Sequence, residues 1–257
     1  MTMNAEQDYN KMSWLYNALY GEMPIERLRQ LDYVKNHSEL LLSYDKKHLS
    51  ILDSACGNGV QATALALNGY QVTATDISSE MVKLTRESAK KHRVEINTAV
   101  KAWCELPATF KEQFNIVFCT GNSIVHSANA DERKINWDSL VQVLKTQGTL
   151  VVETRNWDKI IMEDKRFTVY DKIRYKDKEY IPLYHWRMNG MEHEAEVEIL
   201  FQEIDGDNHV RLYESSLRFT PFRYIDLLDA MRSLGLEIIQ DTFDKECDWY
   251  QIYGRKP

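Results

Sequence analysis

The chain has 257 residues, 44% of them hydrophobic, which is enough to bury the core of one large α/β domain or of a domain with an embedded insertion. Lys and Arg number 32 against 39 Asp and Glu, and the net charge of -7 favours a small-molecule substrate over nucleic acid or an anionic membrane surface. The sequence has no signal-like start, no run long enough to span a bilayer and no zinc-type cysteine spacing, so it predicts a cytoplasmic protein that needs no metal.

The first 47 residues predict a helical segment. Apolar side chains recur at roughly helical intervals, and Pro24 stands where a second helix could begin. The apolar positions are Trp14, Leu15, Leu19, Leu28, Leu31, Val34, Leu40 and Leu41.

From Leu49 the pattern changes to short apolar runs that alternate with amphipathic segments. LSILDSA and YQVTATD are typical of strands, and VQATALALNG and SSEMVKLTRESAKKH are typical of the helices that follow them. This βαβα order predicts parallel strands joined by crossover helices, with ligands bound beyond the carboxyl ends of the strands.

The same alternation continues through VEINTAVKAW, FNIVFCTGNS, a helix over about 132–145 and the strand GTLVVETR. It is interrupted over 163–219, where partial alternation in VEILFQEI and RLYESSLRF predicts an antiparallel insertion that caps the substrate site. A helix in PFRYIDLLDAMRSLG and strands in LEIIQDTF and WYQIYGRK complete the pattern. We therefore expect three units: a helical lid over 1–47, a Rossmann-like core over 48–162 and 220–257, and the insertion.

The segment that follows the first predicted strand reads Asp53-Ser54-Ala55-Cys56-Gly57-Asn58-Gly59 and leads directly into a helix. Glycine allows a sharp turn and a close approach of the backbone to a ligand. Asp76 ends the second predicted strand, where a carboxylate can accept hydrogen bonds from both ribose hydroxyls of an adenosine.

Three interpretations of this turn are open. Gly57-x-Gly59-x-x-Ala62 fits a loose nicotinamide fingerprint, but such a site holds an anionic pyrophosphate at the helix N-terminus. The negative charge of Asp53 suits instead the cationic amino-acid group of S-adenosylmethionine. The third interpretation is a tight strand–helix turn beside an exposed acid. Because Asp76 accompanies the turn, S-adenosylmethionine is favoured.

The segments DSACGNGV, TATD, TGNSIVH and VVETRNWDKI, with DYNKMSWLYNALYG before them, resemble those of the glycine and glycine/sarcosine N-methyltransferases. The resemblance is dense to about residue 162 and looser in the insertion. It implies a class I methyltransferase fold: a seven-stranded, mostly parallel sheet with an N-terminal helical lid and an antiparallel insertion.

The resemblance also implies how S-adenosylmethionine is bound. Arg27 would pair with the cofactor carboxylate, Asp76 would bind the ribose, and Ala102 and Trp103 would flank the adenine. The implied cofactor residues are Tyr9, Tyr20, Arg27, Asp53, Ala55, Gly57, Gly59, Asp76, Ala102, Trp103, Thr120 and His126.

For the methyl acceptor, the resemblance implies Asn122 and Arg155, together with Tyr175 near the methyl group. A guanidinium holds a carboxylate by two parallel charge-assisted hydrogen bonds, and the amide oxygen of Asn122 could accept from the amine. The implied reaction is methylation of glycine to sarcosine and of sarcosine to dimethylglycine, leading toward the osmolyte glycine betaine. The chain departs from the family at Asn58, where a Thr is frequent, and its later insertion aromatics, such as Phe201 and Phe219, match less well.

Several of these residues have structural alternatives. Trp103 could be a core aromatic, His126 a loop histidine and Arg155 an ion-pair partner of Glu153 or Asp158. Alternative functions are a sarcosine/dimethylglycine enzyme, an enzyme for another small amine, an NAD-dependent oxidoreductase and a non-catalytic cofactor sensor. A homo-oligomer is compatible with all of them.

Overall fold

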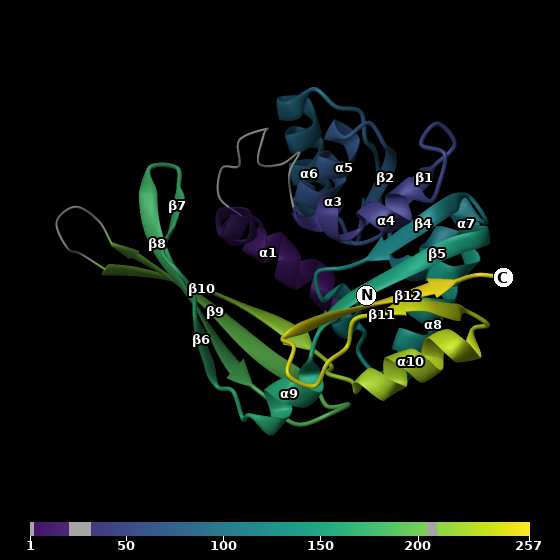
Figure 1. The fold of residues 1–257 in the computed structure, drawn as a ribbon. Helices are drawn as coiled ribbons and strands as arrows, with labels where there is room; N and C mark the ends of the chain where they lie inside the picture. Colours follow the sequence, from purple (N-terminus) through teal and green to yellow (C-terminus); the bar gives the residue numbers. More distant parts are fainter. Residues whose placement is uncertain (1–2, 21–31, 205–209) are drawn as a thin grey trace.

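The computed structural model describes residues 3–20, 32–204 and 210–257, and Figure 1 shows their arrangement. A seven-stranded sheet forms the centre, in the order β11-β12-β5-β4-β1-β2-β3. All its neighbouring strands are parallel except β12, which runs antiparallel to both β5 and β11. The strands are β1 (Ser50–Asp53), β2 (Gln71–Asp76), β3 (Asn97–Val100), β4 (Phe114–Cys119), β5 (Leu144–Arg155), β11 (Glu237–Asp241) and β12 (Trp249–Arg255).

Both faces of this sheet are buried. Ile51 contributes to a cluster with α3, α4 and α5, and the next residue, Leu52, contributes to a second cluster with α1, α8 and α10. Alternate side chains of a strand point to opposite faces, so a sheet covered on both sides requires such continuous apolar runs. The described helices are α1 (Met3–Tyr20), α3 (Asp32–Asn36), α4 (Ser38–Leu42), α5 (Val60–Leu67), α6 (Ser79–His92), α7 (Leu106–Phe110), α8 (Ala130–Gln142), α9 (Trp157–Met162) and α10 (Tyr224–Ser233), with short 3₁₀ helices η1 (Trp103–Glu105) and η2 (Ser123–His126).

A second, antiparallel sheet fills the interval between α9 and α10 and extends away from the core (Figure 1). Its long strands β8, β9 and β10 pair in register, for example Leu183 with Leu200 and Leu217 with Val197. The strands are β6 (Phe167–Val169), β7 (Ile173–Tyr175), β8 (Lys178–Arg187), β9 (Ala195–Ile204) and β10 (Val210–Phe219).

Helix α1 lies between the two sheets (Figure 1) and contacts β10 and β7 on one side and α6 on the other. A mostly parallel seven-stranded core, a helical N-terminal segment and an antiparallel insertion are the predicted fold class, which is confirmed. The boundaries of the three predicted units, and the role of the first as a lid, stay predictions.

Strand order reverses between β1 and β4, because the chain runs from β1 outward to β3 and then returns to the other side of β1. The crevice beyond the carboxyl ends of two such strands is where open α/β sheets bind ligands. The turns after β1 and β4 therefore meet at the place where the sequence predicts a cofactor site.

Candidate functional site

The turn after β1 is held by backbone geometry that favours glycine. Gly57 and Gly59 have φ angles of 52° and 78°, and Gly59 is the N-cap of α5. A Cβ on Gly59 would lie 2.8 Å from Thr85 of α6, so the turn also requires the absence of a side chain there. The amide of Gly57 donates to Asp76 Oδ2 at 3.0 Å, which ties the turn to the end of β2.

Asp76 is buried, and each of its carboxylate oxygens accepts a backbone hydrogen bond. Oδ1 accepts from Ser78 N at 2.9 Å, and Oδ2 accepts from Gly57 N. Burial raises the pKa of this carboxyl to about 6, although the backbone hydrogen bonds oppose the shift. Each oxygen keeps a further lone pair, so the expected contacts with ribose hydroxyls are compatible with this arrangement.

Asp53 ends β1 with its side chain 1% exposed, and its Oδ2 has no hydrogen-bond partner among the described residues. Burial, followed by repulsion from Asp76, raises the pKa of Asp53 to about 7. An uncompensated buried carboxylate is costly unless a cation or a donor reaches it. The α-ammonium of S-adenosylmethionine is such a group, so the acid fits the predicted cofactor.

A small pocket adjoins the turn. Thr120, at the end of β4, donates to Gln61 Oε1 at 2.8 Å, and Tyr16 of α1 covers the opposite side, where a Cβ on Gly57 would lie 3.0 Å from its ring. The lining residues are Tyr16, Ala55, Cys56, Asn58, Val60, Gln61, Thr120, Gly121 and Ser123. Ala55 and Thr120 were expected here, whereas Tyr16 and Gln61 were missed because their placement depends on packing between elements.

Helix α1 is hydrogen-bonded to the turns that follow β1 and β2. Ser78 donates to Asn10 Oδ1 at 2.6 Å, and Asn58 Nδ2 donates to Asn17 Oδ1 at 3.1 Å. Two predicted cofactor residues of this segment cannot be placed: Tyr20 ends α1 but its side chain lies outside the described residues, as does all of Arg27. Their roles stay predictions.

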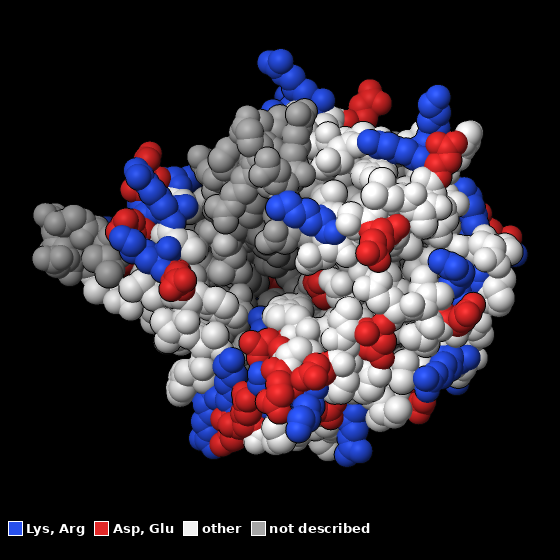
Figure 2. Space-filling model, viewed as in Figure 1, with Lys and Arg blue, Asp and Glu red and all other residues white. Residues whose placement is uncertain are grey.

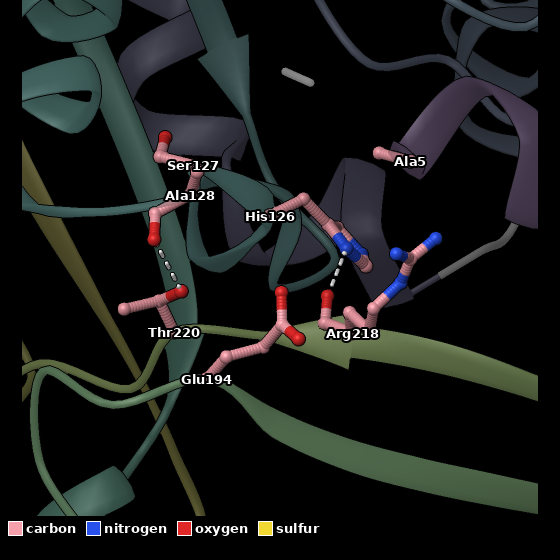
Figure 3. A pocket seen from close by; sticks show the side chains of 7 residues that line it. All are labelled: Ala5, His126, Ser127, Ala128, Glu194, Arg218 and Thr220. Carbon is pink, nitrogen blue, oxygen red and sulfur yellow. Dashed lines mark hydrogen bonds between the residues drawn. The ribbon is translucent and has the colours of Figure 1, made fainter. Parts of the chain in front are cut away.

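Tyr9 and His126, both predicted to reach the cofactor, contact each other at 2.9 Å through Tyr9 Oη and His126 Nε2. His126 Nδ1 lies 2.9 Å from the carbonyl oxygen of Arg218, a pure acceptor, so Nδ1 carries the proton and Nε2 accepts from Tyr9 (Figure 3). Burial lowers the pKa of His126 to about 4, so the ring is neutral. In this arrangement the pair joins α1 to β10.

Trp103 is a core residue in this structure. Its side chain is 1% exposed, and its indole Nε1 donates to the carbonyl oxygen of Ser54 at 2.8 Å. The ring therefore supports the turn after β1 from behind. Ala102 is half-buried at the N-cap of η1, and its amide donates to Glu105 at 2.8 Å. Contact of Ala102 and Trp103 with an adenine stays a prediction. Because the indole of Trp103 is buried, only its main-chain atoms could make this contact.

The two residues expected to bind the acceptor lie side by side. Asn122, with φ 64°, follows β4, and its Oδ1 accepts hydrogen bonds from Arg155 N at 3.2 Å and Thr154 Oγ1 at 2.8 Å. A carbonyl oxygen has two lone pairs. Both are engaged, so the expected acceptance of a hydrogen bond from a substrate amine would require Asn122 to release one partner, whereas its Nδ2 remains a donor.

The guanidinium of Arg155 lies between two indole rings. It is 4.5 Å from the ring centroid of Trp249 on β12 and 5.1 Å from that of Trp186 on β8, and Nη2 lies 3.3 Å from Tyr170 Oη. The alternative of an ion pair with Glu153 or Asp158 is not seen, and Arg155 has no ion-pair partner within the described ranges. The sequence did not predict the aromatic residues around Arg155, because three separate segments supply them: Tyr170, Trp186 and Trp249.

Tyr175, the third predicted acceptor residue, lies on β7 and is buried. Its hydroxyl accepts from Asn17 Nδ2 at 3.3 Å, and Asn17 in turn contacts Asn58 of the glycine turn. The structure thus connects Tyr175 to α1, while Tyr170 is the tyrosine in contact with Arg155. The role of Tyr175 in methyl transfer stays a prediction.

Two features of the described residues concern metal ions and membranes. They contain no group of three or more His, Cys, Asp or Glu side chains that could hold a metal ion, and no helix among them has both the length and the apolar run that crossing a membrane requires. On the face seen in Figure 2, acidic and basic side chains of the described residues are interspersed.

Comparison with known proteins identifies the class of this site. Residues 51–148 match the family described as a methyltransferase domain. The glycine/sarcosine N-methyltransferase of Aphanothece halophytica is 28% identical over 168 residues, which cover 56% of this chain and 63% of that protein. The chain thus spans less than two thirds of that relative.

Solved structures extend the match to nearly the whole chain. An S-adenosylmethionine-dependent methyltransferase from Clostridium acetobutylicum superposes with a TM-score of 0.74 at 16% identity, covering 96% of this chain and 98% of that one. CalS10, an amino pentose methyltransferase from Micromonospora echinaspora solved with SAM bound, gives 0.71 at 14% identity, covering 95% and 97%. The class I methyltransferase fold and the similarity to the glycine/sarcosine N-methyltransferases are confirmed. The match to a methyltransferase domain agrees with S-adenosylmethionine as the predicted cofactor.

Proposed function

We propose that this chain, a class I S-adenosylmethionine-dependent methyltransferase by its fold and by the domain at residues 51–148, methylates the amine of a small amino acid, with glycine and sarcosine as acceptors. The observation that carries the proposal is the guanidinium of Arg155. It lies at the carboxyl end of β5 beside Asn122, between two indole rings and without an ion-pair partner among the described residues.

The acceptor carboxylate would be held by Arg155. The cation–π contacts with Trp186 and Trp249 restrain the guanidinium, so its N–H groups can orient a carboxylate. Asn122 Nδ2 is a second donor for the same group, since Oδ1 is engaged by Thr154 and Arg155. Fixing the carboxylate of so small a molecule also fixes the position of its amine nitrogen.

The cofactor supplies, when bound, an electrophilic methyl group on a sulfonium. The residues that would hold it are Asp53 for the ammonium, the Gly57–Gly59 turn for the methionine part and Asp76 for the ribose. The task of the protein is to align the acceptor nitrogen with this methyl group, and such positioning is worth roughly 7–11 kcal/mol in favourable cases. The amine must be neutral to react, and it can lose its proton to solvent before it is enclosed.

Other acceptors remain alternatives: sarcosine and dimethylglycine, or another small amine. An acceptor without a carboxylate, such as an amino sugar, would leave the N–H groups of Arg155 without a carboxylate in direct contact, which favours amino acids. An NAD-dependent oxidoreductase is a weaker alternative, because the Asp53 carboxylate beside the turn, whose Oδ2 has no partner among the described residues, opposes an anionic pyrophosphate. With glycine and sarcosine as acceptors, the products would lead toward glycine betaine, an osmolyte.

A methylation assay with separate acceptors tests this proposal. Purified protein, S-adenosylmethionine and either glycine, sarcosine, dimethylglycine or an amino sugar are incubated, and methylated products are detected by mass spectrometry. We expect transfer to glycine and sarcosine. Measured binding of the cofactor with transfer to none of the amino acids would rule out the proposed acceptors and leave the fold assignment intact.

The guanidinium is tested by Arg155→Lys and Arg155→Ala. Lys keeps the charge but loses the planar fork and its stacking, and each hydrogen bond to a charged group contributes about 1.5–3 kcal/mol. We therefore expect kcat/KM for glycine to fall roughly 10- to 150-fold in Arg155→Lys and further in Arg155→Ala, while the cofactor Kd is unchanged. Arg232→Ala, an exposed arginine of α10, is the matched control.

A further inference from the structure

The turn that carries Asn122 is held by a carboxylate. Gly121 and Asn122 have φ angles of 67° and 64°, two successive left-handed residues. The amide of Gly121 donates to Glu153 Oε1 at 3.2 Å, and the amide of Asn122 donates to the backbone carbonyl oxygen of Glu153 at 3.1 Å. A non-glycine residue in this conformation is unfavourable unless its surroundings hold it there. Glu153 supplies both of these acceptors.

Glu153 is itself held from the neighbouring strand. Gln251 of β12 pairs directly with Glu153 across the sheet, and its Nε2 donates to Glu153 Oε2 at 2.6 Å. Gln251 Oε1 accepts from Tyr253 Oη at 2.9 Å, two residues farther along the same face of β12. Each Glu153 oxygen therefore has a donor of its own.

The chain of hydrogen bonds ends at His37, between α3 and α4. His37 Nδ1 lies 2.7 Å from Tyr253 Oη. Because Tyr253 donates its only proton to Gln251, His37 Nδ1 must be the donor in this bond. Tyr253 and His37 are each 1% exposed. All the donors thus point in one direction, from His37 through Tyr253 and Gln251 toward the carboxylate of Glu153.

We propose that Glu153 is a positioning residue for the acceptor site, and that Gln251, Tyr253 and His37 form a relay that fixes its carboxylate and hence the turn at Gly121–Asn122. The role in acceptor binding rests on the proposed function. None of the four relay residues lines the pocket at the glycine turn, but Gly121, whose amide Glu153 holds, does line it. Loss of the relay therefore acts first on the turn that carries Asn122.

The chain offers a matched pair of tyrosines for the test. Tyr253 and Tyr250 both lie on β12 and are both 1% exposed, but the hydroxyl of Tyr250 has no hydrogen-bond partner in the part of the chain that the structure describes. Tyr253→Phe removes a member of the relay, whereas Tyr250→Phe removes a hydroxyl of similar burial outside it. Glu153→Gln keeps the shape of Glu153 but presents an amide that cannot accept from both Gly121 and Gln251.

Hydrogen–deuterium exchange of the free protein is the primary measurement. We expect the amides of the peptide covering residues 120–126 to exchange faster in Glu153→Gln and Tyr253→Phe than in wild type or Tyr250→Phe. In the methylation assay we expect KM for the acceptor to rise about 3- to 10-fold in Tyr253→Phe and tenfold or more in Glu153→Gln, with a smaller change in the cofactor Kd.

Unchanged exchange of the 120–126 peptide in both relay variants would overturn the proposal. An equal effect of Tyr250→Phe would also overturn it, because the cause would then be general loosening of β12. If wild type methylates neither glycine nor sarcosine while the exchange pattern is as expected, the proposed acceptors fail and the positioning of the turn by Glu153 stands.

Discussion

The role proposed for Asp53 would couple cofactor binding to protons. Its folded-state pKa of about 7 lies above the ordinary carboxyl value, because burial and then Asp76 disfavour its charge. The folded state therefore binds a proton more tightly than the unfolded chain. This contribution stabilises the free protein at low pH and is lost as the pH rises from about 4 to about 7.

A cation bound beside Asp53 requires the ionised form, so we expect cofactor affinity to rise with pH. With a pKa near 7, the ionised fraction grows roughly tenfold between pH 6 and pH 8, and Kd for S-adenosylmethionine should fall by about that factor. Titration calorimetry at pH 6, 7 and 8 measures it. Asp53→Asn should bind more weakly at pH 8 and lose most of the pH dependence, whereas the exposed Asp177→Asn should not. A Kd that is independent of pH in wild type would contradict this role.

At the scale of elements, the junction of β1 and α5 depends on backbone conformations that only glycine adopts cheaply. Gly59 combines a φ of 78° with a neighbour, Thr85, that leaves no room for a Cβ. Gly235, after α10, has almost the same φ of 77° but nothing within 4 Å of its would-be Cβ. The two positions separate the effect of the backbone from the effect of packing.

We expect Gly235→Ala to lower the free energy of unfolding by about 1–2 kcal/mol, the cost of a left-handed non-glycine residue. Gly59→Ala should cost more, since α5 or α6 must also shift, and it should weaken cofactor binding. Chemical denaturation and calorimetry of both variants measure these effects. Equal losses of stability would mean that the contact between the turn and α6 relaxes freely.

The sequence predicted those parts of the molecule that depend on local patterns. Asp76 ends β2, the turn with Gly57 and Gly59 lies between β1 and α5, and the core strands fall within the predicted segments, except that β5 begins earlier than predicted. The predicted helix over 132–145 was wrong at its end: α8 stops at Gln142, and β5 already begins at Leu144, because Gly148 lies within the strand and does not precede it. The early strands of the insertion gave little signal, since β6 and β7 have three residues each and β8 contains Pro182.

The surroundings of Arg155 could not be predicted for a different reason. Trp249 comes from β12, Trp186 from β8 and Tyr170 from the segment after β6, so their meeting is a property of the tertiary structure. Nothing in the sequence distinguishes Trp103 from Trp186. In the structure, Trp103 supports the glycine turn from the core, and Trp186 contacts the guanidinium of Arg155.

At the scale of the whole molecule, α1 joins the cofactor core to the insertion. Arg218 of β10 donates to both carboxylate oxygens of Asp8, at 2.9 and 3.1 Å, and Tyr9 contacts His126. On its other side, α1 is hydrogen-bonded through Asn10 and Asn17 to the turns that follow β2 and β1. Any movement of α1 away from the glycine turn would therefore strain or break its contacts with the insertion.

The neutral His126 makes this junction sensitive to acid. Its folded pKa of about 4 lies below the ordinary value of 6.5, so its contribution to stability is fully present above pH 6.5 and is lost as the pH falls toward 4. We expect the stability advantage of wild type over His126→Asn, which keeps a donor for Arg218, to shrink by about 2 kcal/mol between pH 7 and pH 5. Urea unfolding at both pH values measures the difference, and a constant advantage would show that His126 is not protonated on unfolding.

The bond between Asp8 and Arg218 spans 210 positions of the chain. Contacts of such separation form late, because the entropy of closing a long loop must be overcome first. During synthesis, α1 leaves the ribosome early but cannot meet β10 until residue 219 has been added, after most of the Rossmann-like core has been made. We therefore expect the contacts of α1 with β10 to form after those of α1 with α6, so that newly made chains pass through a stage in which α1 is not yet tied to the insertion.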